Sequence, residues 1–165
     1  MMISKKMNAA IDQQIGAEFG ASLQYVAMAA YFQEESYPIL AAHFFKQAEE
    51  EREHALRLVK YALETGGHVK IPAVAAPKNS FTSAEEAVAL ALDWERNVTR
   101  MINDLMTLAI QESDYLTQNM LGWFVNEQLE EVSSMENLLK VVQRAGERNL
   151  LYVENYLAHQ QRSGD

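Results

Sequence analysis

The stretch GHVKIPAVAAPKNSFT occupies residues 67–82 and contains two of the chain's three prolines, Pro72 and Pro77. At about 3.3 Å per residue, it can extend over about 50 Å. A helix of about 28 residues is only about 42 Å long. The stretch can therefore run along a whole long helix and join two helices that point in the same direction.

On both sides of this stretch the sequence is rich in Ala, Leu, Glu, Gln and Met, which favour helices, and helix breakers are rare. Pro38 suits the first turn of a helix. Ser83 and Glu86 have the spacing of a capping box, and Asp114 suits an N-cap. No strand-like alternation competes, and the sequence predicts an all-α chain with helices over residues 5–34, 38–65, 84–111, 115–145 and 149–159.

The lengths of the connections predict the topology. The first two long helices, and likewise the third and fourth, are joined by only a few residues, so each pair must be antiparallel. The long stretch between the pairs lets the second and third helices run parallel. We therefore expect residues 1–165 to form a single domain, a four-helix bundle with one long crossover connection and a short fifth C-terminal helix.

Composition excludes several classes of function. The 165 residues carry a formal net charge of −9 and no cysteine. Because the chain has no thiol group, four classes are excluded: zinc ribbons, iron–sulfur clusters, disulfide scaffolds and thiol catalysis. The acidic excess argues against nucleic-acid binding. Because the chain shows neither a signal-peptide pattern nor a run of about 18 apolar residues, we expect a cytoplasmic protein without membrane spans.

Each predicted long helix has an apolar stripe that is interrupted by polar residues. The midpoints of the four helices fall near residues 20, 51, 97 and 130, and a midpoint lies at the same height whichever way a helix points. The interruptions lie at these midpoints, so we expect them to converge on one buried layer. They are Glu18 on the first helix, Glu51 and His54 on the second, Glu95 on the third, and Gln128 and Glu131 on the fourth.

Four glutamates in one buried layer would repel each other and lose their hydration, at a cost of several kcal/mol or more per unpaired charge. Any one of them could be a rim residue whose carboxylate reaches solvent. For the whole set, either the carboxyl groups are protonated or a cation lies among them. Carboxylate oxygens with one imidazole and no thiolate favour iron or manganese. Glu51, one turn before His54, is the candidate bridge between two ions of a redox site.

Four motifs also carry a resemblance to a known family. They are AEEEREHA at residues 48–55, DWE at 93–95, WFVNEQLEE at 123–131 and LYVENYL at 151–157. With these motifs the sequence resembles non-haem bacterial and archaeal ferritins over essentially its whole length. The resemblance implies the ferritin-like form of the four-helix bundle.

Carried over residue by residue, the resemblance implies three iron positions within one subunit. Tyr25 is similar to the family tyrosine that donates an electron during oxygen reduction. The first iron would be held by Glu18, Glu51 and His54, the second by Glu51, Glu95 and Glu131 with Gln128 beside them, and the third by Glu50, Glu127 and Glu130 with Glu131 shared.

Related families differ at defined residues. Other di-iron proteins have a second E-x-x-H motif. In this chain the corresponding residues 128–131 are QLEE, so Glu131 stands where those proteins have the histidine. Arg52 stands where bacterioferritins have a haem-ligating methionine, so the resemblance implies no haem. Rubrerythrins need a four-cysteine iron centre, which this chain cannot form. The fifth helix resembles the one that completes a 24-subunit ferritin shell.

The resemblance implies iron storage with ferroxidase activity: Fe(II) is oxidised by O2 or H2O2 and deposited as ferric mineral inside a homo-oligomeric shell. Two alternatives stay open from the sequence. One is a stand-alone carboxylate-bridged di-iron oxidase or oxygenase that acts on an organic substrate, and the other is a purely structural bundle. Glu112 and Asp114 are candidate channel residues.

Overall fold

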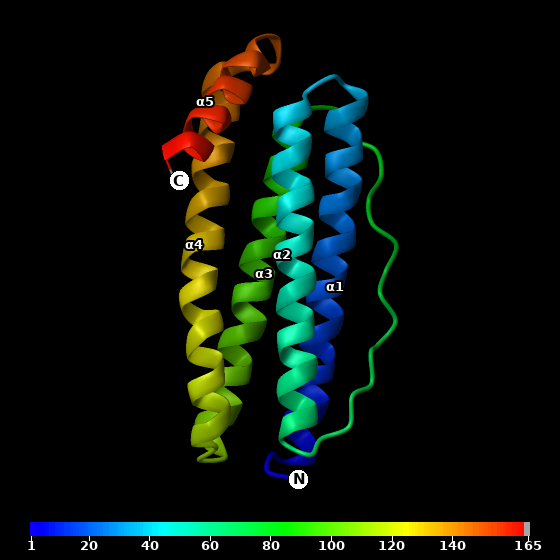
Figure 1. The fold of residues 1–165 in the computed structure, drawn as a ribbon, viewed down its shortest axis with the longest axis vertical. Coiled ribbons are helices and arrows are strands. Elements are labelled where there is room, and N and C mark those ends of the chain that lie inside the picture. Colours follow the sequence, from blue (N-terminus) through cyan, green and yellow to red (C-terminus); the bar gives the residue numbers. More distant parts are fainter. Residues whose placement is uncertain (164–165) are drawn as a thin grey trace.

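The computed structural model describes residues 1–163. Within them, the chain forms helices and no strand, which confirms the all-α prediction. Figure 1 shows four long helices side by side, with a short one packed across the end of the bundle. The helices are α1 Lys5–Glu34, α2 Pro38–Glu64, α3 Ala84–Gln111, α4 Tyr115–Ala145 and, after the 3-10 turn η1 Glu147–Asn149, α5 Leu150–Ser163.

The helices α1 and α2 form one antiparallel pair and α3 and α4 form the other, while α2 and α3 run in the same direction (Figure 1). Each pair is closed by a turn of the same kind. Ser36 and Ser113 both adopt a positive φ, and the next residue's backbone N–H donates to a carbonyl five residues earlier, Tyr37 to Phe32 and Asp114 to Ala109. Short turns of this form leave no alternative to antiparallel packing.

The crossover over residues 67–82 runs along the outer side of α1, in the same direction (Figure 1). Asn8 exchanges two hydrogen bonds with the backbone of His68, and Asp12 accepts one from Lys70. Farther along, Pro72 lies against Gly16 and Val74 lies near Gly20. Between His68 and Val74 the connection advances two residues for every four of α1, because two extended residues and four helical residues both rise by about 6 Å.

Two carboxylates dock the C-terminal segment onto the bundle. Glu154 on α5 is buried and accepts hydrogen bonds from the backbone N–H groups of Ile39 and Leu40, in the first turn of α2. Glu147 caps the first turn of α3 in the same way, through the N–H groups of Ala84 and Glu85. A helix N-terminus presents unpaired N–H groups and a positive dipole end, which a carboxylate neutralises.

The apolar core has two separate parts. One cluster contains Phe32 and Phe44 and extends to α5, and the other contains Ile15 and Phe124 at the opposite end of the bundle. Between them, each of the four long helices has a gap in its apolar stripe. The polar residues predicted from the sequence fall in these gaps, so the bundle is divided at mid-height by a polar layer.

Candidate metal centre

The polar layer is shielded from solvent. Glu18, Glu51 and Glu95 are each 0% exposed, and His54 is 4% exposed. Gln128 and Glu131 are also buried. Together these residues bring side chains from all four long helices into one place.

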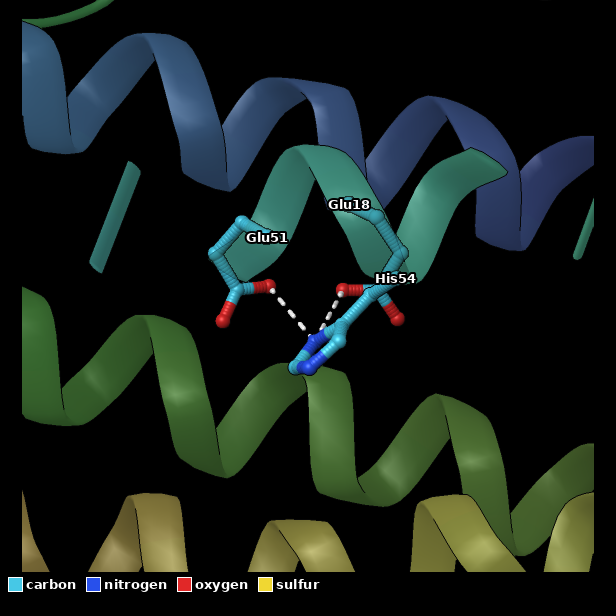
Figure 2. A group of neighbouring side chains, drawn as sticks. All are labelled: Glu18, Glu51 and His54. Atoms are coloured by element: carbon cyan, nitrogen blue, oxygen red, sulfur yellow. Dashed lines mark ion pairs between the residues drawn. The ribbon is translucent and has the colours of Figure 1, made fainter. Parts of the chain in front are cut away.

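One group of possible ligands comes from α1 and α2. The Nδ1 atom of His54 lies 3.5 Å from Glu51 Oε2 and 4.0 Å from Glu18 Oε2 (Figure 2). These three atoms, and the second oxygen of Glu51, are buried and have no hydrogen-bond partner within residues 1–163. Buried polar atoms are almost always hydrogen-bonded. A cation among them would satisfy all three side chains at once.

A second group brings together Glu51, Glu95 and Glu131, with one oxygen of each within 4.8 Å of the others. The same criterion unites Glu18, Glu51 and His54. Glu51 belongs to both groups and has two unpartnered oxygens, so it can contact two ions at once. Two adjacent positions that share one carboxylate form a carboxylate-bridged pair.

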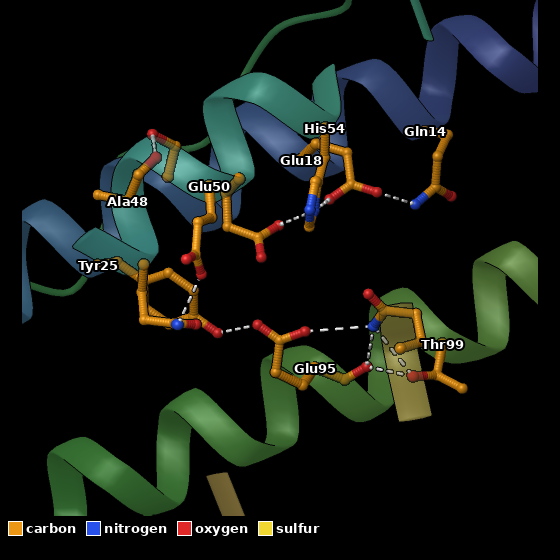
Figure 3. A network of polar contacts seen from close by, with 12 residues as sticks. Gln14, Glu18, Tyr25, Ala48, Glu50, His54, Glu95 and Thr99 are labelled. Carbon is orange, nitrogen blue, oxygen red and sulfur yellow. Dashed lines mark hydrogen bonds and ion pairs between the residues drawn. The ribbon is translucent and has the colours of Figure 1, made fainter. Parts of the chain in front are cut away.

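The carboxylate of Glu95 is held by hydrogen bonds from two sides, and Figure 3 shows the one from Tyr25. The hydroxyl of Tyr25 donates to Oε1, and the amide nitrogen of Gln128 donates to Oε2 over 3.2 Å. Both Tyr25 and Gln128 thus lie against the layer as the sequence predicts.

Two further residues at the layer were missed by the sequence reasoning. Gln14 donates to Glu18 Oε1 over 2.7 Å, and Thr99 accepts from the Gln128 amide over 3.1 Å. Each lies four residues from a layer glutamate on its own helix. This spacing, which places side chains on the same face, was the available signal.

The residues predicted for a third ion are less close together. Glu127 groups with His54 and Glu131, and with Glu50 it lines a surface cavity of about 520 Å³. Glu50 accepts a hydrogen bond from Gln47 over 2.9 Å. Glu130 is exposed and lines a different cavity, beneath α5. The structure therefore brings Glu127 to the layer and leaves Glu130 apart from it.

Burial raises the pKa of all four layer glutamates, and it is the largest cause for each of them. The negative charges of neighbouring glutamates add to the effect for Glu18, Glu51 and Glu131. The pKa of Glu131 rises to about 8. Without a cation, burial in the layer therefore favours the protonated form of each of these carboxyl groups. A cation would favour the ionised forms.

The imidazole of His54 is fixed by aromatic packing. The Trp123 ring meets it edge-on with centroids 5.4 Å apart, and Phe124 packs on it at 5.9 Å. The guanidinium of Arg57 stacks on the Trp123 ring, 3.9 Å from the ring centre. These contacts hold Nδ1 toward the carboxylates, and the His54 and Trp123 rings both line the cavity that Glu127 lines.

The sequence of residues 8–145 matches the family described as the ferritin-like domain. The chain belongs to this family. Ferritin BfrB of Mycolicibacterium smegmatis is 43% identical to it over 158 residues, which cover 96% of this chain and 87% of the relative. The bacterial non-heme ferritin of Staphylococcus aureus is 39% identical over 153 residues, 92% of each chain.

Solved structures agree with this ferritin-like assignment. An open pore ferritin from the hyperthermophilic archaeon Archaeoglobus fulgidus superposes with a TM-score of 0.91 at 35% identity, over 94% of this chain and 96% of that one. The family match ends at residue 145, before α5, and it includes every residue of the polar layer. The resemblance to ferritins and the ferritin-like bundle are thus confirmed. Separately, none of the described helices is long and apolar enough to cross a membrane.

Proposed function

We propose that this ferritin-like protein stores iron and that its polar layer is a ferroxidase centre. Family membership and the ferritin relatives support iron storage with ferroxidase activity. One observation carries the assignment of the centre: unpartnered buried atoms of Glu18, Glu51 and His54 converge beside a second carboxylate group that shares Glu51. Hard oxygen donors with one imidazole suit Fe(II) as the substrate.

In this proposal Glu18, Glu51 and His54 bind one Fe(II), and Glu51, Glu95 and Glu131 bind the other. The shared carboxylate keeps the two ions close enough to react with one oxidant molecule. Each Fe(II) loses one electron, and O2 takes both electrons and two protons to give H2O2. If H2O2 is the oxidant, it takes two electrons and two protons to give two water molecules. The carboxylates stabilise the added charge of Fe(III).

Two nearby features fit later steps. Glu127 forms a group with His54 and Glu131, which offers a third iron position at the mouth of the surface cavity. Tyr25 donates its hydrogen bond to Glu95 and is fully buried, which suits a side chain that supplies one electron to the centre. We further propose a 24-subunit homo-oligomeric shell around the ferric mineral, without haem.

The test is aerobic oxidation of Fe(II) by the apo-protein, followed as ferric absorbance. We expect the double variant Glu51→Ala, His54→Ala to lose the fast phase by at least about a hundredfold, since it removes ligands of both ions. Glu49→Ala is the matched control, because Glu49 is exposed on the same helix, and it retains the wild-type rate. Fast oxidation that survives in the double variant overturns the site assignment.

Size separates storage from the alternative of a stand-alone di-iron enzyme. An iron store needs a closed shell, whereas an oxidase or oxygenase can work as a monomer or dimer. Sedimentation of the protein with and without iron distinguishes the two. A species near twice the mass of one chain, with no dense mineral after Fe(II) and air, contradicts storage.

A further inference from the structure

The amide nitrogen of Gln128 faces three oxygen atoms. It lies 3.1 Å from Thr99 Oγ1, 3.2 Å from Glu95 Oε2 and 3.3 Å from the backbone carbonyl oxygen of Glu95. Figure 3 shows Glu95 and Thr99 side by side on α3, with the dashed lines that converge between them. All three contacts come from α3, whereas Gln128 is on α4.

Toward Gln128, the hydroxyl of Thr99 can only act as an acceptor. Its single proton is donated to the backbone carbonyl of Glu95 over 2.8 Å. Its lone pairs are therefore left for the amide of Gln128. An amide NH2 has two protons, and the Glu95 carboxylate takes one of them. Thr99 takes the other at a shorter distance than the backbone carbonyl offers.

The oxygen end of the amide is in consequence turned away from α3. Gln128 Oε1 is buried and has no donor within residues 1–163. If the amide were reversed, Oε1 would face the carbonyl and the carboxylate of Glu95, two further acceptors. The geometry thus determines which end of the amide is free, although the two ends have nearly the same shape.

We propose that Thr99 is a positioning residue that holds the Gln128 amide with its oxygen toward the second iron, the one placed at Glu51, Glu95 and Glu131. This inference rests on the proposed function. A carbonyl oxygen attracts a cation, whereas an NH2 group in its place repels one. Outer hydrogen-bond partners of this kind commonly change metal affinity by about 10–100-fold.

The matched pair of variants is Thr99→Val and Thr99→Ser. Valine keeps the shape but removes the acceptor, which leaves one buried N–H of Gln128 without its partner. Serine keeps the hydroxyl and can make both bonds. Anaerobic titration with Co(II), followed by visible absorption, measures the two sites separately. We expect Thr99→Val to weaken the second ion about tenfold and leave the first unchanged, and Thr99→Ser to match the wild type.

Kinetics give an independent readout. In Thr99→Val the Fe(II) concentration for half-maximal oxidation rises about tenfold while the maximal rate stays within about twofold. In a Gln128→Leu background, Thr99→Val has no further effect, because the amide that it positions is absent.

Three results overturn the proposal: unchanged affinity for the second ion in Thr99→Val, failure of Thr99→Ser to restore it, or an undiminished effect in the Gln128→Leu background. Failure of the proposed function looks different, because the wild type itself then binds no pair of Co(II) ions. Thermal unfolding of each apo-variant shows that it is folded before titration.

Discussion

Burial makes each layer carboxyl group hold its proton more tightly than it would in water. Glu131 is the clearest example, with a pKa of about 8 against an ordinary value of 4.5. Between these two pH values the folded chain keeps a proton that the unfolded chain releases. The resulting contribution to stability is full below about pH 4.5 and is lost as the pH rises through about 8.

This linkage predicts how the stability of the apo-protein depends on pH. We expect the contribution of Glu131 to its free energy of unfolding to fall between about pH 4.5 and about pH 8. We expect Glu131→Gln, which resembles the protonated form, to flatten the slope by a few kcal/mol in total, at about 1.4 kcal/mol per pKa unit. Denaturant unfolding in metal-free buffers at several pH values measures it. An identical slope in the variant contradicts the prediction.

The titration of His43 changes the stability in the opposite direction, at acid pH. Burial lowers its pKa from 6.5 to about 4. Its contribution to stability is therefore present above about pH 6.5 and is lost as the pH falls through about 4. His43 lies outside the polar layer, so Glu131→Gln leaves this acid limb unchanged.

At the residue scale, sequence periodicity and helix midpoints were enough to predict the members of the layer. They could not predict Thr99 or Gln14, because a hydrogen bond between helices depends on side-chain rotamers and on axial offsets of less than one turn. Glu130 shows the same limit. It follows Glu127 by three residues, yet a rotation of about 100° per residue separates it from Glu131, and its carboxylate lies beneath α5.

At the scale of elements, the crossover depends on close approach to α1. A Cβ atom at Gly16 would collide with the ring of Pro72, whereas a Cβ atom at Gly122 on α4 would meet nothing within 4 Å. Both glycines are within helices, so the intrinsic gain from alanine is the same. The pair separates packing against the crossover from helix propensity.

We expect Gly16→Ala to destabilise the protein by about 1–3 kcal/mol, the usual cost of overpacking. Gly122→Ala, the control, stabilises it by about 0.5–1 kcal/mol through helix propensity. Thermal unfolding of the two variants beside the wild type measures the difference. Equal effects of the same sign would show that Pro72 moves away from the new methyl group without a loss of stability.

The helix boundaries could be predicted from capping residues such as Ser83, whose side chain accepts a hydrogen bond from the backbone N–H of Glu86. The path of the crossover was not. Its length indicated only how far it could reach, and its placement on α1 depends on Asn8, Asp12 and Gln24, whose polar side chains bond its backbone. The α5 helix also extends beyond the expected residue 159, to Ser163.

At the scale of the whole molecule, the polar layer interrupts the core where a bundle normally has its best packing. The two apolar clusters are therefore separated by buried carboxyl groups. A cation that binds only the folded chain stabilises it by mass action. Metal binding and global stability are coupled through the same residues.

We expect Co(II) at a hundred times its dissociation constant to stabilise the apo-protein by about 2.7 kcal/mol for each site filled. Differential scanning calorimetry at increasing Co(II) measures this as a rise in Tm. The variant Glu51→Ala, His54→Ala shows no such rise, while Glu49→Ala responds as the wild type does. A comparable rise in the double variant would place the metal elsewhere.

The contacts between the crossover and α1 restrict the number of residues that the crossover can contain. An ordinary surface loop accepts an extra residue at little cost. Between Ile71 and Ala75, however, exposed and half-buried residues alternate, so one inserted residue turns Pro72 and Val74 away from α1, whereas two restore the alternation. We expect a one-residue insertion after Ile71 to lower the Tm more than a two-residue insertion. This segment tolerates changes of length by parity, not by size.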